Sequence, residues 1–228
     1  MNDLRLLHLC DSLFPLGGFA YSDGLEAATS GGSVAIAADL GGWLDVCLDE
    51  TIGRLEGPGV WLAWLAFRDG DWVSIVVLDE ELTALRPSAS ARRSSRAMGL
   101  RLLTTWQALH PDGRLEHAIA LARGGRLGPV LSVAFAGACA CAGIERRRSV
   151  ESFAYTRLAA TISAAMRLMP IGQAGAHALL ARATGRVPAI VDAIVSREGA
   201  GVRLEAFSPA MDLAAMSQQY LHSRLFRS

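Results

Sequence analysis

This sequence of 228 residues contains no lysine: all 22 of its basic residues are arginine. The absence of lysine excludes three kinds of site together: the phosphate-binding lysine of a P-loop, a Schiff-base lysine, and a lysine acting as a general base. We therefore expect no ATP or GTP held in a standard P-loop.

The sequence also has no net charge, few cysteines and no recognisable targeting segment. The basic residues are balanced by 22 acidic ones, and a net charge of zero argues against nucleic-acid binding through a basic surface. Only four cysteines are present, in apolar stretches, which favours reduced thiols. The amino terminus lacks the regions of a signal peptide, and the apolar run from Pro129 to Ile144 is shorter than the roughly 20 residues of a membrane span. These features predict a cytoplasmic protein that binds neither nucleic acid nor membrane.

The motifs of catalysis and metal binding are missing as well. The five histidines are scattered, and no glycine pattern matches a dinucleotide-binding turn or a nucleophile elbow. His8 with Cys10, and Cys139 with Cys141, are spaced two apart, which on a helix separates side chains by about 200°. We interpret these as packed side chains rather than metal ligands. The sequence predicts no catalytic residue, no metal site and no cofactor, and hence a protein that is not an enzyme.

Helical periodicity dominates what is present. From Ser149 to Met169 apolar residues recur every three or four positions, which predicts a central helix capped by Ser149, covered on most sides and stopped by Pro170. Hydrophobic residues make up 51% of the chain, enough for a sizeable core. No repeat, linker or strand alternation interrupts the pattern. We predict an all-α fold: a single globular domain over residues 1–228, with about ten helices packed around a central buried helix.

Two stretches require a choice. Residues 73–78 have the composition of a strand, but Trp72, Ile75 and Leu78 keep a helical spacing, so we predict a helix. Further on, Gly185 and Arg186 separate two apolar stretches, and we predict separate helices over residues 174–183 and 187–197.

The last six residues combine two arginines with the pair Leu225 and Phe226. An apolar pair is unsuited to a solvated terminus. We predict a flexible, partner-binding tail at about residues 223–228, which orders on a partner with Phe226 as its anchor and Arg224 as a polar clamp. The aromatic residues Phe19 and Tyr21, beside the glycine pair of the amino-terminal turn, admit a similar interpretation.

Four stretches together resemble the urease accessory protein F family (UreF). The first is the run from Leu9 to Glu26, LCDSLFPLGGFAYSDGLE, and the second is SRAMGLRLL at residues 95–103. The third is RLMPIGQ at residues 167–173, and the fourth joins FSPAMD at residues 207–212 to SRLFRS at the carboxyl terminus. They occur in the order of the family and span essentially the whole chain.

The resemblance implies a maturation chaperone for urease. A homodimer of such subunits binds the UreD/UreH accessory protein and recruits the UreG GTPase, so that nickel is inserted into apo-urease. In the family motif Phe19 and Arg224 match residues tied to recruiting the GTPase. Tyr21 stands where histidine is frequent, and residues 216–219 read Met-Ser-Gln-Gln where Met-x-His-Glu is common. The expected protein-binding residues are Phe19, Tyr21, Ser22, Glu26, Arg224, Leu225, Phe226 and Arg227.

Two other functions are also compatible with the sequence. An all-α domain could bind or process a small anionic ligand through an arginine-rich face that extends from Arg92 to Arg101 and includes Arg167; a solvated helix face explains the cluster at Arg92, Arg93 and Arg96 equally well. Direct nickel carriage by this subunit has only His8 and Cys10 to support it.

Overall fold

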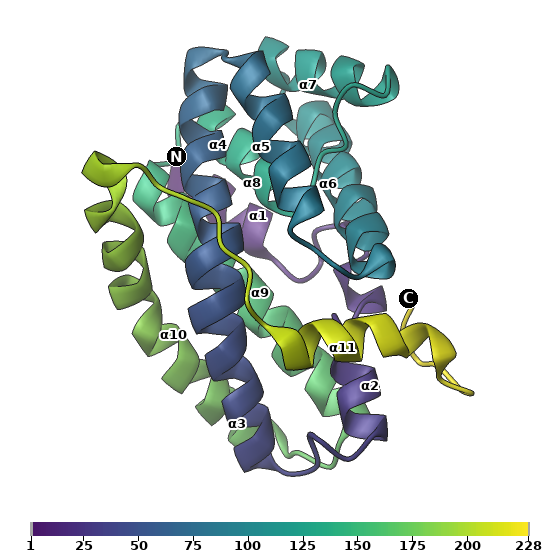
Figure 1. The fold of residues 1–228 in the computed structure, drawn as a ribbon. Coiled ribbons are helices and arrows are strands. Elements are labelled where there is room, and N and C mark those ends of the chain that lie inside the picture. Colours follow the sequence, from purple (N-terminus) through teal and green to yellow (C-terminus); the bar gives the residue numbers. More distant parts are fainter. Residues whose placement is uncertain (1, 228) are drawn as a thin grey trace.

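The computed structural model describes residues 2–227, and every regular element there is a helix (Figure 1). This confirms the predicted all-α fold. The α-helices are α1 (Asn2–Cys10), α2 (Leu25–Ser30), α3 (Ala37–Val46), α4 (Gly57–Asp69), α5 (Trp72–Ala84), α6 (Ala89–Leu109), α7 (Gly113–Arg123), α8 (Leu131–Cys141), α9 (Arg146–Leu168), α10 (Gln173–Ser196) and α11 (Pro209–Ser217). A π-helical segment, η2 (Cys47–Glu56), joins α3 to α4 in one rod. Short 3₁₀ turns are η1 (Gly18–Ala20), η3 (Glu198–Ala200) and η4 (Gln218–Tyr220). Within this part of the chain no helix is both long and apolar enough to cross a membrane.

The most deeply buried helix is α8, in which every residue from Leu131 to Ala140 is buried. Its small side chains let neighbouring helices approach closely. At Gly137 an added Cβ atom would lie 2.7 Å from the ring of Phe67 on α4, so only glycine fits this crossing. The apolar run that the sequence marks as too short for a membrane span is therefore the innermost helix of the core.

The predicted central helix is α9, which runs behind α3 and α4 in Figure 1 and packs against α1, α2, α4, α8 and α10. It begins at Arg146, earlier than predicted. Ser149 lies in its first turn, where the hydroxyl donates a hydrogen bond to the carbonyl of Glu145 at 2.9 Å instead of capping the helix. Tyr155 and Met166 are partly exposed, so one face of α9 borders solvent.

The helix predicted from Trp72 is confirmed as α5, and Asp71 begins it by accepting a hydrogen bond from the Ser74 amide at 3.1 Å. The predicted break in α10 is wrong, because this helix continues from Gln173 to Ser196. Arg186 binds carboxylates of the α3–η2 rod, and Val187 is buried against the core, so tertiary contacts outweigh the low local propensity of glycine.

A buried carboxylate supports the start of α8. Asp79 of α5 accepts hydrogen bonds from the backbone amides of Gly128 at 3.1 Å and Val130 at 2.8 Å. Only 1% of its surface is exposed. Burial raises the pKa of Asp79 to about 6, despite the opposing hydrogen bonds from the two amides.

This raised pKa predicts a pH-dependent stability. The folded state holds the proton of Asp79 more tightly than the unfolded state, so the stabilising contribution is complete at low pH and is lost as the pH rises through about 6. Between pH 5 and pH 7 the wild type should lose about 1 kcal/mol relative to Asp79→Asn. Urea titrations of both proteins across this range test the prediction, and parallel pH curves would contradict it.

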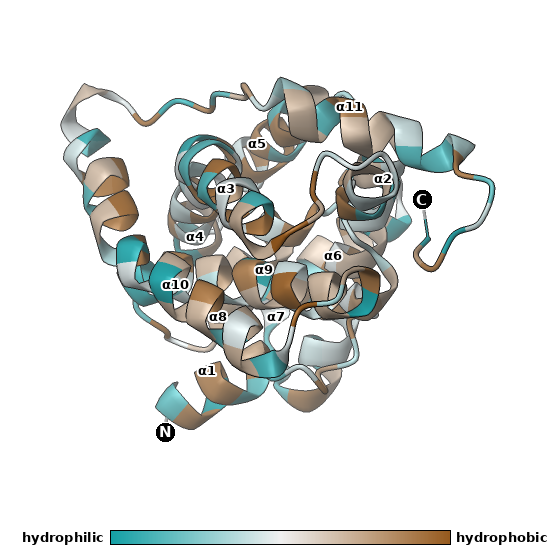
Figure 2. Cartoon of the chain, turned by 90° about the horizontal axis from the view of Figure 1, so that it is seen from below, coloured by the Kyte–Doolittle hydropathy of each residue, from teal (hydrophilic) through white to brown (hydrophobic). Residues whose placement is uncertain are grey.

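The carboxyl-terminal segment crosses one edge of the molecule. Seen from below, α11 lies over α2, and the loop that follows α11 returns to end beside α2 (Figure 2). Buried apolar side chains form one cluster that includes Leu6 near one end of the chain and Phe226 near the other. Both termini of the described chain are thus attached to the same core.

Candidate protein-interaction site

The glycine-rich turn at residues 17–20 presents an aromatic side chain to solvent. Gly17 has φ of 72°, a backbone conformation that glycine adopts readily, and an added Cβ atom there would lie 2.6 Å from the guanidinium of Arg101. The turn continues into η1, where 75% of the surface of Phe19 is exposed, whereas Phe14 is buried in the core. The turn therefore lies between Phe14, which packs in the core, and Phe19, which is exposed to solvent.

Glu26 joins this turn to the carboxyl-terminal tail. Its side chain is buried, with 6% exposed, and its two carboxylate oxygens accept hydrogen bonds from the backbone amides of Leu225 and Phe226, the latter at 3.2 Å. Glu26 also accepts a hydrogen bond from the side-chain amide of Gln218 at 3.2 Å. One carboxylate thus holds a segment about 200 residues away along the chain.

Gln218 and Ser22 complete the junction. The carbonyl oxygen of the Gln218 side chain accepts hydrogen bonds from the Ser22 hydroxyl and the Gly24 amide, both at 3.2 Å. The Ser22 hydroxyl in turn accepts from the Glu26 amide at 3.4 Å, in the first turn of α2. The glutamine at the position where histidine is common in the family is therefore a buried, uncharged bridge between η4 and α2.

The tail lies against the body of the molecule. Phe226 is 4% exposed and the guanidinium of Arg167 stacks 4.2 Å from its ring centroid. The Arg227 amide donates a hydrogen bond to the carbonyl of Ala20 at 2.7 Å. Leu225 remains 55% exposed. In this structure Phe226 thus anchors the tail to its own chain, while Ser228 lies outside the described residues.

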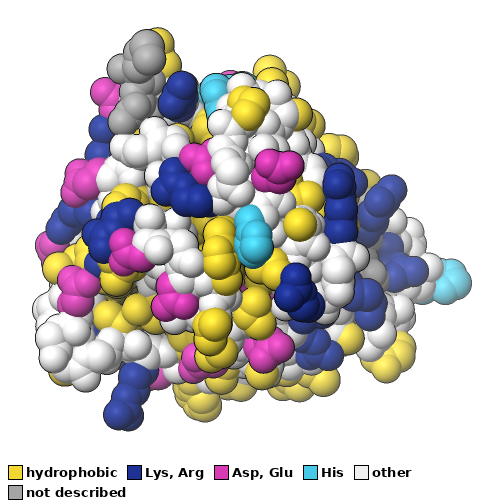
Figure 3. Space-filling model, turned by 90° about the horizontal axis from the view of Figure 1, so that it is seen from above, with side chains coloured by type: hydrophobic (Ala, Val, Ile, Leu, Met, Phe, Trp, Pro, Cys, Tyr) yellow, Lys and Arg dark blue, Asp and Glu magenta, His cyan; other side chains and the backbone are white. Residues whose placement is uncertain are grey.

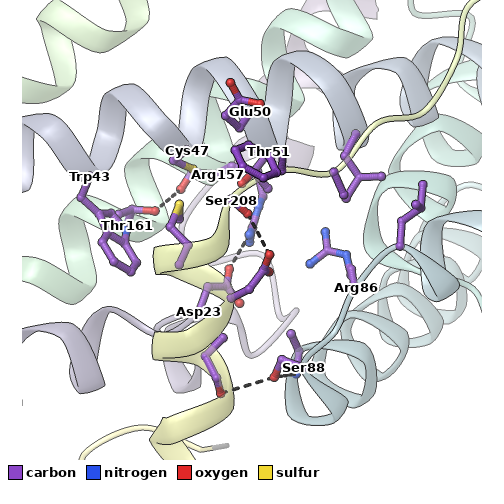
Figure 4. Close-up of a pocket in the computed structure, with 18 residues that line it drawn as sticks. Asp23, Trp43, Cys47, Glu50, Thr51, Arg86, Ser88, Arg157, Thr161 and Ser208 are labelled. Atoms are coloured by element: carbon purple, nitrogen blue, oxygen red, sulfur yellow. Dashed lines mark hydrogen bonds and ion pairs between the residues drawn. The ribbon is translucent and has the colours of Figure 1, made fainter.

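A buried ionic cluster lies next to a cleft whose lining includes residues of α3, η2 and α11 (Figure 4). Arg157 of α9 forms ion pairs with Asp23 and with Glu56, the latter at 3.1 Å, and Arg86 also binds Glu56. Glu56 is only 2% exposed. Asp23, which has an unusual φ of 49°, points towards Arg157 in Figure 4.

The charges of this cluster stabilise one another. Burial opposes ionisation of Asp23, yet the positive charges of Arg157 and Arg86 lower the pKa of its carboxyl below the usual value. Burial likewise disfavours the charged form of Arg157, but Asp23 and Glu56 raise the pKa of its guanidinium. Burial raises the pKa of the nearby Cys47 thiol to about 12. The arginines here are occupied by carboxylates, and the thiol is protonated at neutral pH, which suits a structural junction.

The histidine and cysteine residues spaced two apart do not form metal sites. The His8 ring packs against Phe14, at 5.5 Å between centroids, and against Trp106 at 6.2 Å. Burial raises the pKa of Cys10 to about 11 and that of Cys141 to about 12, and it also raises the pKa of Cys139. Among residues 2–227 no group of three or more histidine, cysteine or carboxylate side chains is placed to hold a metal ion.

The arginine-rich face does not form a single site. Arg92 donates to the backbone carbonyl of Pro87 at 2.8 Å, and Arg96 reaches the Thr83 hydroxyl at 3.4 Å. Basic side chains gather at the right of the upper face, on the side where α6 lies (Figure 3). Arg101 and Arg167, in contrast, line one pocket beside the glycine turn, together with Arg227.

Four of the eight expected interaction residues, Phe19, Tyr21, Leu225 and Arg227, border this pocket. Ser22 and Glu26 lie in the hydrogen-bonded junction, Phe226 is buried against Arg167, and Arg224 is exposed on the tail. Sequence reasoning did not assign Arg101, Arg167 or Gln218 to the pocket or the junction. A signal was available for the two arginines, because both lie within stretches that carry the family resemblance.

Comparisons with known proteins identify the family of this chain. The family model described as UreF matches residues 34–184. The urease accessory protein UreF of Methylibium petroleiphilum is 35% identical over 228 residues, covering 99% of this chain and 93% of that protein. UreF of an Azoarcus species is 30% identical, covering 99% and 95%. The bifunctional urease accessory protein UreEF of Bordetella bronchiseptica is 31% identical over 98% of this chain and 51% of its own length.

Proposed function

Because the chain belongs to the UreF family of urease accessory proteins, we propose that it is a scaffold for urease maturation. It binds the UreD/UreH accessory protein and recruits the UreG GTPase, and the assembly inserts nickel into apo-urease. The observation that supports this role is the junction at Glu26, which unites the amino-terminal turn and the carboxyl-terminal tail in one surface.

The exposed residues of that surface are the proposed contacts. Phe19 and Leu225 offer apolar side chains at a surface whose backbone is held by hydrogen bonds, a combination that favours protein recognition. Tyr21, Arg224 and Arg227 lie within the same two segments. We propose that the tail engages a partner in its docked form: Phe226, which is buried, holds the tail on this chain, and Leu225 and Arg227 face the partner.

We further propose that the protein acts without catalysis of its own, as a homodimer in the cytoplasm. The arginines most deeply buried are neutralised by Asp23 and Glu56, and the cysteine thiols are protonated at neutral pH, so the polar groups of the core serve packing rather than chemistry. Arg92 and Arg96 bind groups of their own chain, which argues against the alternative of a small-ligand site on that face.

Capture of purified UreD and UreG by the intact chain tests the scaffold directly. We expect Phe19→Ala to reduce capture of UreG about thirtyfold, since truncating an exposed aromatic hot spot costs about 2 kcal/mol. The matched control is Val73→Ala, which removes a similarly exposed apolar side chain from α5. A chain truncated after His222 should lose UreG as well. Failure of the intact chain to capture either partner would overturn the proposal.

A further inference from the structure

The pocket beside the glycine turn has an unusual charge pattern. Its volume is about 510 Å³, and its wall includes Arg101 of α6, Arg167 of α9 and Arg227 of the tail. None of the described residues that line it is an aspartate or a glutamate. Three positive charges thus come from three separate elements to one opening, where Figure 1 places the tail beside α2 and α6.

These three guanidinium groups have charge and N–H donors available to bind a ligand. Ten other arginines of residues 2–227 pair with carboxylates, but Arg101, Arg167 and Arg227 form no such pair within this part of the chain. Arg167 donates to the carbonyl of Phe19 at 2.7 Å, and Arg101 approaches that of Leu16 at 3.5 Å. A guanidinium has five N–H donors, so each of these two has several left.

The walls between the arginines are apolar. Phe19 and Leu225 are largely exposed at the rim, and Leu16 lies deeper. An inorganic anion would use only the charges of such a pocket, whereas a peptide carrying carboxylates beside an apolar side chain would use both. Electrostatic complementarity with a segment of that kind would also orient and accelerate docking.

We propose that this pocket receives an acidic segment of a protein partner, whose carboxylates bind Arg101, Arg167 and Arg227 while an adjacent apolar side chain packs on Phe19 and Leu225. The proposal rests on the proposed function, because it specifies how the surface made by the turn and tail engages its partner. Arg101 and Arg227 are the residues to test, because Arg167 also stacks on Phe226 and its loss would disturb the seating of the tail.

The first measurement uses fluorescein-labelled peptides of sequence EELEE and QQLQQ, with anisotropy recorded on the intact chain at low ionic strength. We expect EELEE to bind and QQLQQ not to bind. Arg101→Gln and Arg227→Gln should each weaken EELEE binding about tenfold, the effect of removing one charge-assisted contact. Arg123→Gln, an exposed arginine of α7 outside the pocket, should leave binding unchanged.

Three results would overturn the proposal: no binding of EELEE at millimolar concentration, equal binding of the two peptides, or an equal effect of the control variant. Inorganic phosphate at matched ionic strength distinguishes a general anion site; if it displaces EELEE more effectively than chloride does, the pocket is not built for a peptide. Circular dichroism spectra that match those of the wild type show that each variant is folded.

Capture of purified UreG by the same variants separates this proposal from the proposed function. If the intact chain captures UreG and both glutamine variants capture it equally well, the acidic-segment proposal is wrong and the scaffold function stands. If the intact chain captures neither UreD nor UreG while EELEE binding still depends on Arg101 and Arg227, the scaffold function fails and the pocket stands. We expect UreG capture to fall about tenfold in each variant.

Discussion

Replacing Arg157 by methionine is expected to lower the free energy of unfolding by about 3–5 kcal/mol. The substitution preserves much of the side-chain volume but leaves Asp23 and Glu56 without the cation that pairs with both of them. Since Glu56 is 2% exposed, water cannot replace the lost partner. Arg86 remains beside Glu56 and limits the loss. Equilibrium urea denaturation followed by circular dichroism measures the effect.

The matched control is Arg186→Met, which removes an arginine from exposed ion pairs with Asp45 and Asp49 on the α3–η2 rod. Surface pairs contribute about 0–1 kcal/mol, so this variant should stay close to the wild type. The double variant Arg157→Met, Asp23→Asn should recover part of the loss, because Asp23 has lost its ion-pair partner, whereas Glu56 keeps Arg86. Equal effects of the two arginine substitutions would show that the ion pairs of the cluster contribute no more to stability than surface ion pairs do.

The same cluster predicts an acid-sensitive component of stability. The pKa of Asp23 is lowered in the folded state, so its contribution is present above the pKa of the unfolded chain and is lost as the pH falls through the lowered value. That component depends on Arg157, so the stability of the methionine variant should decline less steeply between neutral and acid pH.

Replacing Glu26 by alanine is expected to free the tail while leaving the rest of the fold in place. The substitution removes the acceptor for the amides of Leu225 and Phe226 and for the side chain of Gln218. Two hydrogen bonds to a carboxylate together contribute about 3 kcal/mol, so the population of the detached tail should rise about a hundredfold.

Hydrogen exchange read by mass spectrometry on carboxyl-terminal peptides measures this release. The Arg227 amide is the decisive probe, because its acceptor is the carbonyl of Ala20 and is not altered by the substitution. Glu205→Ala, which removes an exposed partner of Arg54, serves as the control. If Arg227 exchanges at the wild-type rate in Glu26→Ala, then Phe226 and Arg167 hold the tail without help from Glu26.

The outcome also bears on recognition. Phe226 packs beside Arg167 and so keeps Leu225 and Arg227 of the tail at the wall of the proposed pocket. A tail released by Glu26→Ala should therefore bind UreG more slowly, because the docked tail forms the contact surface before the partner arrives. Faster binding would show that the docked tail opposes recognition.

The sequence by itself determined the helices and the family. Helical spacing of apolar residues identifies α5 and α9, because this signal acts over one or two turns of backbone. The stretches at the two ends and within α6 carry the resemblance that the comparisons confirm. The signals for helix ends were weaker: Gly185 suggested a break that packing of α10 overrides.

Only the tertiary structure decided which polar residues meet. Glu26 binds amides at Leu225 and Phe226, and Arg157 binds Asp23 more than 130 positions earlier in the chain. No local pattern specifies such pairs, because each depends on how α2, α9 and the tail pack against one another and on which charges that packing removes from water. The same packing directs Arg101, Arg167 and Arg227 into one pocket. Local periodicity therefore determines the helices of this protein. The packing of those helices determines which charged residues are buried in contacts between its two ends and which remain available to bind a partner.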